Sequence, residues 1–343
     1  MRTLSCLTVS VTIRDVAHAA GVSQATAARA LGGYGYASDT TRSRVAVAAA
    51  QLGYRPNGVA RALVSRATYT VGLVVGDIEN PFFAAAARGL ADVLEPEGYT
   101  VLLTNSDESA EREERAVETL RARRVDGLVV VPAERAAPRH LIDLVSAGVP
   151  LVQLDRAVTG VAADAVLVDN EVGAGRAVEH LIGLGHRRIG IVTDRPSVSS
   201  SADRLEGYRG ALHRAGIERD RSLESVGGST QAEGFAAACR LLTGEHRPSA
   251  VFTANNFMTV GTLLAIRELG LRVPEDVALV GFDDLDWTTL VEPAVTVISQ
   301  PVTALGRVAG ECLLERLGGG GGEPRTVRLR TELIVRGSCG APA

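Results

Sequence analysis

Lysine is absent from this chain. All 36 basic residues among its 343 are arginine. A phosphate-binding loop of the G-x-x-x-x-G-K-S/T type needs a lysine amine, and so do Schiff-base and pyridoxal mechanisms. The composition therefore excludes these sites and reactions.

Cysteine and long apolar runs are also scarce. The four cysteines show neither a C-x-x-C pair nor the spacing of a zinc site or a disulfide framework; they are Cys6, Cys239, Cys312 and Cys339. We therefore expect reduced thiols and no metal. No apolar run approaches the roughly eighteen residues of a membrane span. With 46% apolar and 22% charged residues, the chain has the composition of a soluble globular protein.

Signals for export and for catalysis are weak. Residues 4–11 are mildly apolar, but Arg14 and Asp15 follow directly and only Arg2 supplies a charged start. We therefore expect no signal peptide and a cytoplasmic protein. The six histidines are scattered, and neither H-E-x-x-H nor G-x-S-x-G occurs. These absences predict a protein that is not an enzyme and uses no cofactor.

The net charge of −4 conceals an uneven distribution. Residues 1–66 contain eight arginines against two aspartates, a net charge of +6, so the rest of the chain carries −10. A basic head on an acidic body favours a head that meets a polyanion, with nucleic acid as the leading candidate. A solvated basic face without a partner fits the charge equally well.

The basic head predicts a small helical domain. Thr12 and Asp15 form a capping box, Gly21 permits the positive φ of a tight turn, and Ser23 and Ser38 can each cap a helix. The three predicted helices span residues 13–20, 24–31 and 39–52, and the third ends at Gly53. Ala17 leaves room for the first two helices to cross closely, and the small core is expected from Val16, Val22, Ala27, Ala30 and Leu31. Many helical pairs with a glycine turn never touch DNA, so the pattern alone is moderately specific.

If the head is a helix-turn-helix, its second helix enters the major groove. Gln24, Ala25 and Arg29 then face the bases, because glutamine pairs with adenine, arginine with guanine, and an alanine methyl contacts thymine. Phosphate contacts are expected from the hydroxyls of Ser23, Thr26 and Thr41, and Thr12 also belongs to this DNA-binding set.

Residues 54–63 contain Pro56 followed by about two helical turns. The segment is too short to be stable alone and needs a partner or DNA to order it. A passive tether between domains is the alternative.

These residues resemble the DNA-binding head and hinge of the lactose-repressor (LacI/GalR) family. The resemblance rests on residues 12–17, 20–23, Thr26, Arg29 and residues 54–57 and 60–63. It implies that the hinge becomes helical on the operator and that the leucine matching Leu63 wedges into the minor groove. Unstacking there costs a few kcal/mol, which the contacts of the bent duplex offset. Asn57, Ala60 and Arg61 complete the expected DNA-binding residues, and residues 1–11 form an N-terminal extension.

The remainder of the chain predicts an α/β body. Apolar, β-rich runs alternate with helical stretches, which is typical of parallel sheets buried on both faces. The predicted strands are residues 71–75, 99–104, 127–131, 150–154, 189–193, 250–253 and 277–281. By resemblance, the body is of the periplasmic-binding-protein type, with two doubly wound parallel sheets.

The resemblance also divides the chain into domains. We expect a helix-turn-helix domain at residues 12–55, a hinge at 56–67 and an effector-binding domain at 68–340. Its N-lobe is expected at about 68–163 and 299–320, and its C-lobe at about 164–292 and 325–338. The three crossings between lobes are then expected near residues 162–169, 291–298 and 318–325.

Ligands of open α/β sheets bind beyond the carboxyl ends of the strands. The candidate effector-binding residues follow those strands or share the helical face of Ser200 and Arg204; they are Asn80, Phe82, Phe83, Asp155, Arg156, Ser200, Arg204, Asn255 and Asp283. In the resembled family, the positions of Arg204, Asn255 and Asp283 hold the effector. Carboxylates, amides and a guanidinium around an aromatic ring suit a sugar.

Each candidate also has a purely structural interpretation. Asp155 and Asp283 could cap the following helices, and Arg204 could form a structural ion pair. Phe82 and Phe83 are adjacent, so we expect only one of them to face the crevice.

The sequence therefore predicts a DNA-binding transcriptional regulator, a repressor rather than an activator, that binds its operator as a homodimer. A small-molecule effector between the lobes, most simply a sugar or a sugar derivative, controls operator affinity. Whether it releases or promotes DNA binding stays open. The alternative is a free-standing sugar-binding or transport protein with the same body, against which the basic head argues.

Overall fold

The computed structural model describes residues 11–32, 36–54, 67–134, 138–245 and 247–340. The chain divides into two compact units, Met1–Tyr69 and Thr70–Ala343. Among the helices of these residues, none combines the length and the apolar character needed to cross a membrane.

The first unit contains the three helices that the sequence predicts. They are α1 (Ile13–Ala19), α2 (Gln24–Gly32) and α3 (Asp39–Leu52). Gly21 adopts a φ of 62° in the turn between α1 and α2, and Gly53 ends α3 with a φ of 64°. Ser38 caps α3 by accepting a hydrogen bond from the Thr41 amide. The helix boundaries therefore follow from caps and glycines in the sequence.

The core of this unit consists of small side chains. Its fully buried members are Val16, Ala17, Ala20, Ala27, Val45, Ala48 and Ala49. Val45, Ala48 and Ala49 lie on α3, and the core predicted from the sequence included no residue of this helix. Because alanine and valine dominate, the three helices can pack closely around a core of few atoms.

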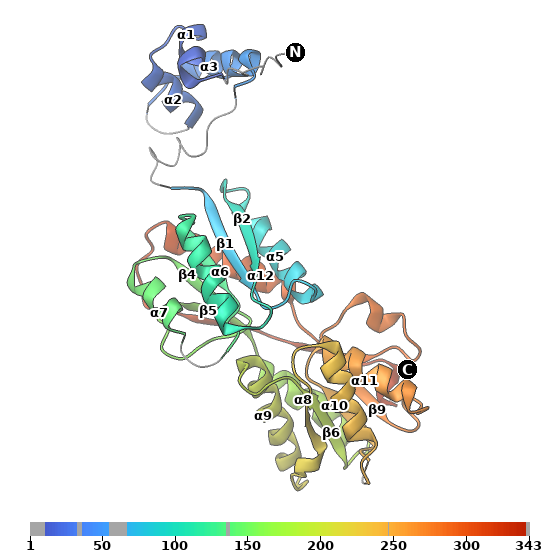
Figure 1. Ribbon diagram of the computed structural model, residues 1–343. Coiled ribbons are helices and arrows are strands. Elements are labelled where there is room, and N and C mark those ends of the chain that lie inside the picture. Colours follow the sequence, from blue (N-terminus) through green and yellow to red (C-terminus); the bar gives the residue numbers. More distant parts are fainter. Residues whose placement is uncertain (1–10, 33–35, 55–66, 135–137, 246, 341–343) are drawn as a thin grey trace, which may run out of the picture. The chain divides into compact units, whose positions relative to one another are not determined.

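The second unit begins with a six-stranded parallel sheet in the order β11-β5-β4-β3-β1-β2. Its strands are β1 (Thr70–Val75), β2 (Thr100–Asn105), β3 (Gly127–Val130), β4 (Leu151–Leu154), β5 (Asp164–Val168) and β11 (Thr326–Leu329). Helices α5 (Pro81–Leu94) and α12 (Val302–Leu317) pack on one face. Helices α6 (Ala110–Ala122) and α7 (Arg139–Ser146) cover the other. We call this layered body the N-lobe (Figure 1).

A second six-stranded sheet, in the order β12-β10-β9-β8-β6-β7, forms the C-lobe. Its strands are β6 (Ile189–Thr193), β7 (Glu224–Val226), β8 (Ala250–Thr253), β9 (Ala278–Phe282), β10 (Thr296–Ser299) and β12 (Glu332–Ile334). Only β12 pairs antiparallel within this sheet. Helices α8 (Asn170–Gly183) and α9 (Ser199–Arg214) cover one face, and α10 (Gln231–Leu242) and α11 (Asn256–Glu268) cover the other. Short 3-10 turns occur at η1 (Arg221–Leu223), η2 (Asp286–Thr289) and η3 (Gly337–Cys339).

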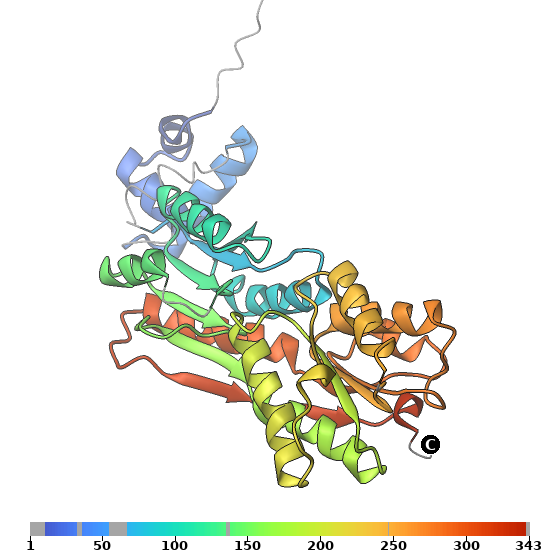
Figure 2. The ribbon, with the colours of Figure 1, turned by 60° about the horizontal axis from the view of Figure 1, so that its bottom comes forward.

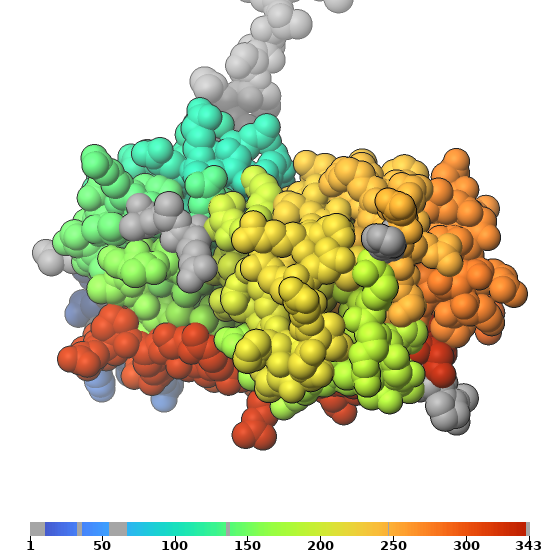
Figure 3. All heavy atoms as spheres, turned by 90° about the horizontal axis from the view of Figure 1, so that it is seen from below, coloured from blue at the N-terminus to red at the C-terminus, as the bar shows by residue number. Residues whose placement is uncertain are grey.

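The two lobes lie side by side, joined by three crossings of the chain (Figure 2). The crossings occur after β5 at Asp169, after β10 at Gln300, and between β11 and β12 at residues 330–331. Asp169 joins two of them, because its Oδ1 accepts hydrogen bonds of 2.7 Å from both the amide and the hydroxyl of Thr331. In Figure 3 the atoms of the C-lobe lie directly against those of the N-lobe on the face shown.

The expected lobe boundaries need correction. Strands β5 and β11 pair with each other in the first sheet, so residues 164–168 and 326–329 belong to the N-lobe instead of the C-lobe. Strand β10 pairs with β9, so residues 296–299 belong to the C-lobe and do not form a crossing. The expected crossing near 318–325 is instead the loop between α12 and β11, and the crossing follows at 330–331. Each crossing needs only one or two residues, whereas the segments expected near 162–169 and 291–298 contain strand residues of β5 and β10.

Glycines bring the helices of each pair into backbone contact. A Cβ on Gly89 of α5 would lie 2.0 Å from the Thr303 carbonyl oxygen, and one on Gly306 of α12 would lie 2.0 Å from that of Ala86. A Cβ on Gly207 of α9 would likewise meet the Glu171 carbonyl of α8 at 2.2 Å. Glycine is therefore required at these positions for the observed packing.

Candidate functional site

The second helix of the head presents the expected base-reading side chains outward. Gln24 and Ala25 are exposed and Arg29 is half-buried. The Arg29 Nε donates a 3.2 Å hydrogen bond to the Ala25 carbonyl, so its guanidinium lies along α2. None of the three belongs to the core of the head. This face is therefore free to enter a groove of DNA.

The expected phosphate-contacting hydroxyls lie at the starts of helices. Ser23 Oγ accepts the Thr26 amide at 3.1 Å and lies 2.8 Å from the Thr26 hydroxyl. Thr41 makes the same pair of contacts with Ser38. Hydroxyls and amides at a helix N-terminus are suited to an oxyanion such as a phosphate.

The expected capping box is also present. The Asp15 carboxylate accepts the amide and the hydroxyl of Thr12 at 2.8 and 2.7 Å. These hydrogen bonds hold the pKa of Asp15 below its ordinary value. Four expected DNA-binding residues, Asn57, Ala60, Arg61 and Leu63, lie outside the described residues, as do residues 56–66 of the hinge.

A cleft opens between the lobes, where the carboxyl ends of both sheets meet. It encloses about 410 Å³ of empty space, the open solvent at its mouth included. All nine expected effector-binding residues line it. Five further residues complete its wall: Asp194, Val198, Ser201, Ala254 and Gln300.

The N-lobe wall begins at the start of α5. Asn80 caps this helix by accepting the Phe82 amide at 3.0 Å. Phe82 and Phe83 are both buried in the N-lobe core, pack edge to face at 5.2 Å between ring centres, and both line the cleft. The expectation that only one of them reaches the cleft was wrong, because the first turn of α5 lies along its wall.

Asp155 and Arg156 follow β4 and are both buried. Asp155 has a φ of 64°, a left-handed conformation that turns the chain sharply at the strand end. Desolvation raises the pKa of Asp155, although the adjacent guanidinium of Arg156 opposes the shift. Burial alone lowers the pKa of Arg156, but the Glu108 carboxylate outweighs burial and holds it above its ordinary value. Burial and charge pairing therefore oppose each other at both side chains.

Arg204 of α9 stacks on an aromatic ring that the sequence-based analysis did not single out. Its guanidinium carbon lies 3.7 Å above the centre of the Phe282 ring. Its Nε donates to Asn170 at 2.8 Å, and its Nη1 donates to the Ala254 carbonyl at 2.6 Å. Burial lowers the pKa of Arg204. The described contacts of Arg204 are thus cation–π and hydrogen-bond contacts, and the structural ion pair of the alternative interpretation is not among them.

Asp283 follows β9 with a φ of 82° and is 7% exposed. It accepts hydrogen bonds from the Asn256 amide at 2.9 Å and from the Gln300 side-chain nitrogen at 2.5 Å. Asn255 caps α11 by accepting the Met258 amide. The carboxylate of Asp283 therefore binds the start of α11, a helix that precedes it in the chain and is not the following helix of the capping alternative. Asp283 also lines the cleft.

Two of the unpredicted wall residues follow the same rule as the predicted ones. Asp194 comes directly after β6, and desolvation raises its pKa. Gln300 comes directly after β10, and its Oε1 is buried without a hydrogen-bond partner among the described residues. Gln300 was missed because β10 was mistaken for a crossing. Asp194 follows the predicted strand 189–193, so its position at a strand end was the signal that could have found it.

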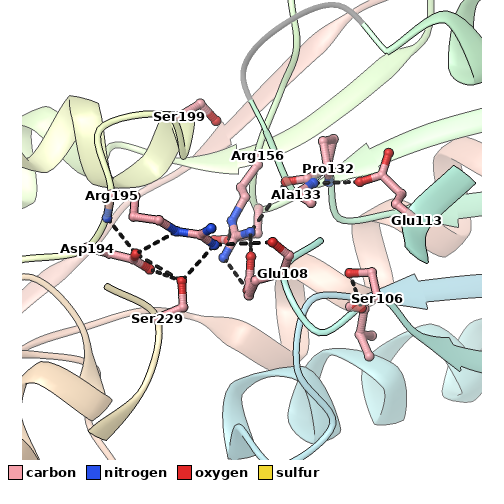
Figure 4. A network of polar contacts seen from close by, with 12 residues as sticks. Ser106, Glu108, Glu113, Pro132, Ala133, Arg156, Asp194, Arg195, Ser199 and Ser229 are labelled. Carbon is pink, nitrogen blue, oxygen red and sulfur yellow. Dashed lines mark hydrogen bonds and ion pairs between the residues drawn. The ribbon is translucent and has the colours of Figure 1, made fainter. Parts of the chain in front are cut away.

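A network of polar contacts continues the cleft outward and joins the lobes (Figure 4). Arg156 makes a bidentate contact with Glu108, at 2.5 and 2.9 Å. From the C-lobe, Arg195 donates through Nη2 to the Glu108 carbonyl at 3.2 Å and to Ser229 at 3.0 Å. The Ser229 hydroxyl donates in turn to Asp194 at 3.0 Å. Within the described residues, no group of histidine, cysteine and carboxylate side chains is placed to hold a metal ion.

The chain is similar to known regulatory proteins along nearly its whole length. The ribose operon repressor of Escherichia coli K12 is 33% identical over 327 residues, which cover 95% of this chain and 99% of that protein. Among solved structures, the complex of the transcriptional regulator CelR with cellobiose is 35% identical, with a TM-score of 0.74 and coverage of 96% of this chain and 99% of that one. The lac repressor dimer bound to operator and the anti-inducer ONPF is 29% identical, with a TM-score of 0.85 and coverage of 97% and 100%.

Two family descriptions match separate parts of the chain. Residues 178–339 match the periplasmic binding protein-like domain, which agrees with the two-sheet body. Residues 12–57 match bacterial regulatory proteins of the lacI family, and this match covers α1, α2 and α3, with Gln24 and Arg29 on α2. With these matches and the full-length similarity to the ribose operon repressor, the chain belongs to the lacI family of bacterial regulatory proteins.

Proposed function

We propose that this protein is a transcriptional repressor that binds its operator through the head and releases or tightens it when a neutral sugar occupies the cleft. The observation that carries the proposal is the pairing of an exposed α2, with Gln24 and Ala25 outward, with an interlobe cleft lined by carboxylates, amides and phenylalanines. Such a protein acts in the cytoplasm, where its DNA is, and we assign it no reaction.

The charge of the cleft favours a neutral ligand. Asp155, Asp194 and Asp283 line it, against Arg156 and Arg204. Because Glu108 already pairs with Arg156, little positive charge remains for a phosphate or a carboxylate. Carboxylates accept hydrogen bonds from hydroxyl groups, and side-chain amides both accept and donate them. An aromatic face can pack on the apolar face of a sugar ring. A monosaccharide or a similarly compact polyol fits both the charge and the limited space.

A homodimer is the expected DNA-binding form. Helix-turn-helix proteins read two half-sites related by the symmetry of the dimer. The similar lac repressor structure is a dimer on its operator, which supports the same assembly for this chain. The free-standing sugar-binding alternative loses its support, because a protein of that kind has no use for a head of the lacI family.

DNA binding is tested by comparing full-length protein with a truncated protein that starts at Thr68. Both are titrated onto duplexes selected from a random pool by the full-length protein, at several salt concentrations. The full-length protein should bind with a steep salt dependence, and the truncated one should not bind. Equal behaviour of the two proteins would overturn the proposal.

The effector class is tested by thermal shift. Neutral monosaccharides should raise the melting temperature, whereas sugar phosphates, sugar acids and purines should not. The responding sugar should then change operator affinity. Stabilisation by the anionic compounds alone would contradict the charge argument.

A further inference from the structure

Glu108 occupies a position that links the cleft to the opposite lobe. It lies in the loop between β2 and α6, with a φ of 55°, and its amide donates to the Gly76 carbonyl at 2.9 Å. Its side chain is only 10% exposed. A carboxylate that is buried at this depth must be paired, and the partner is Arg156.

Gly76, just after β1, clears the space for this carboxylate. A Cβ at position 76 would lie 2.2 Å from Glu108 Oε1 and 2.8 Å from its carboxyl carbon. The backbone of Gly76 does not lie in the left-handed region, and the three atoms nearest to a Cβ at this position all belong to the Glu108 carboxylate. The glycine is therefore explained by the side chain that it accommodates.

The contact with Glu108 determines where the rest of Arg156 lies. Both Nη atoms face Glu108, and the buried Nε has no hydrogen-bond partner among the described residues. Asp155 Oδ2 is 3.4 Å from that Nε, without hydrogen-bond geometry. Arg156 lines the cleft, and a ligand hydroxyl that reached its buried Nε–H would satisfy a donor that the described residues leave unpaired.

The same residue also meets the C-lobe. The Glu108 carbonyl accepts from Arg195, which is anchored on its own lobe by Ser229 (Figure 4). Glu108 thus touches the cleft arginine through its carboxylate and the opposing lobe through its backbone.

We propose that Glu108 is a positioning residue: seated over Gly76, it holds Arg156 for the effector and, through Arg195, holds the two lobes together. The positioning of Arg156 for an effector rests on the proposed function. The contact between the lobes does not depend on it. A sugar that binds Arg156 stabilises the Glu108 loop, and that loop in turn stabilises the closed lobes. Effector binding and lobe closure are thereby coupled through one residue, by its carboxylate on the cleft side and its backbone carbonyl on the side of the C-lobe.

The first test needs no ligand. Spin labels are attached to cysteines replacing the exposed Glu118 of the N-lobe and Arg272 of the C-lobe, in full-length protein carrying Cys6→Ser and Cys239→Ser. The interlobe distance distribution should be narrow in this parent and broader, shifted to longer distances, after Gly76→Ala, Glu108→Gln or Arg195→Ala. The matched controls are Gly183→Ala, where a Cβ meets nothing, and Arg214→Ala, which removes an exposed ion pair with Glu179. Unchanged distributions in all three variants would overturn the lobe contact.

The second readout follows the Arg156 Nε–H signal in ¹⁵N-arginine spectra, assigned by its loss in Arg156→Gln. Gly76→Ala and Glu108→Gln should shift it or speed its exchange with water, and Gly183→Ala should not. A merely structural effect of Gly76→Ala would lower the melting temperature and leave this signal in place, which would refute the positioning role.

The third readout uses D-ribose, D-xylose, D-glucose and D-galactose as probes. The one that binds the parent best should bind Gly76→Ala and Glu108→Gln about tenfold more weakly, which is the expected loss for one misplaced charged hydrogen bond. Equal affinity would contradict the positioning of Arg156. If none of the four binds the parent, the neutral-sugar proposal fails, while the spin-label and NMR results still decide the role of Glu108.

Discussion

The side-chain amide of Asn256 donates a 2.8 Å hydrogen bond to the side-chain oxygen of Asn80 across the cleft. Asn256 is the first residue of α11 in the C-lobe, and Asn80 caps α5 in the N-lobe. The Asn80 oxygen also accepts the Phe82 amide, so one atom serves both the helix cap and the lobe contact. This bond therefore joins the starts of two helices that belong to different lobes.

Gln24→Ala should weaken binding to a selected operator and leave binding to a scrambled duplex unchanged. A bidentate contact between a side chain and a base contributes about 1–3 kcal/mol of discrimination. Fluorescence anisotropy on both duplexes at one salt concentration measures the difference. Parallel losses on the two duplexes would mean that Gln24 does not read bases.

Leu63→Ala tests the expected minor-groove wedge, which lies outside the described residues. Loss of an apolar wedge should reduce affinity for the bent operator more than for non-specific DNA, because only the operator complex offsets the cost of unstacking. Circular-permutation gel shifts report the bend. An unaltered bend angle, or equal loss at both kinds of site, would count against the wedge.

Arg204→Ala and Asp283→Asn should leave operator affinity intact and abolish the response to the effector. Arg204 is held by Phe282, Asn170 and the Ala254 carbonyl, all in the C-lobe, so its loss affects the cleft and not the head. Operator titrations with and without the responding sugar are the measurement. Melting temperatures establish that both variants are folded, and titration curves identical to those of the parent would refute the assignment.

Asp194→Asn should raise the melting temperature at pH 7 by a few degrees and weaken the effector response. Burial raises the pKa of Asp194, so the ionised form is disfavoured in the folded protein. Protonated Asp194 stabilises the folded protein. This stabilisation is fully present below the ordinary pKa of 3.8 and is lost as pH rises through the raised pKa. Scanning calorimetry should therefore show a gain at pH 7 that shrinks toward acid. A lower melting temperature at pH 7 would show that the charge stabilises the fold.

Glu224→Gln should show the opposite pH dependence. Burial opposes ionisation, but hydrogen bonds from Arg209 and Arg219 lower the pKa of Glu224 to about 2 from an ordinary value of 4.5. The stabilisation is present above pH 4.5 and is lost as pH falls toward about 2. Urea denaturation should show a loss of about 1.5–3 kcal/mol at pH 7, typical of hydrogen bonds to a charged group, and a smaller loss at acid pH.

The control for this change is Glu179→Gln, which breaks an exposed pair with Arg214. Exposed pairs contribute roughly 0–1 kcal/mol, so this variant should be close to the parent at every pH. A loss at Glu224 that does not vary with pH would indicate a packing effect instead of a charge effect.

Local signals in the sequence were sufficient for the head. Ser38, Gly21 and Gly53 act through their own backbone and nearest neighbours, so they predict helix boundaries without knowledge of the tertiary structure. The same holds for the strands 71–75 and 189–193, which are apolar throughout. The nine candidate cleft residues were brought together by one rule about strand ends, and the structure places all of them on one wall or the other.

Contacts between residues that lie far apart in the sequence could not be predicted from local patterns. Nothing local to Glu108 indicates that Arg156, 48 positions away, pairs with it. Likewise, strand β5 pairs with β11, whose residues lie more than 150 positions later, and without that pairing the segment resembles a connection. The need for glycine at position 76 could not be predicted either, because it comes from the Glu108 side chain on another loop.

The seam between Gly89 and Gly306 has a mechanical consequence. Helix α5 starts at the cleft after its cap Asn80, and α12 starts beside the crossing at Gln300, so their close packing connects the cleft wall to a crossing between the lobes. A methyl group at Gly89 or Gly306 would force α5 and α12 apart, although neither glycine belongs to the cleft wall or to the head. A substitution at either glycine would therefore change how steeply operator binding depends on effector concentration and leave the residues of the cleft and of the head unaltered.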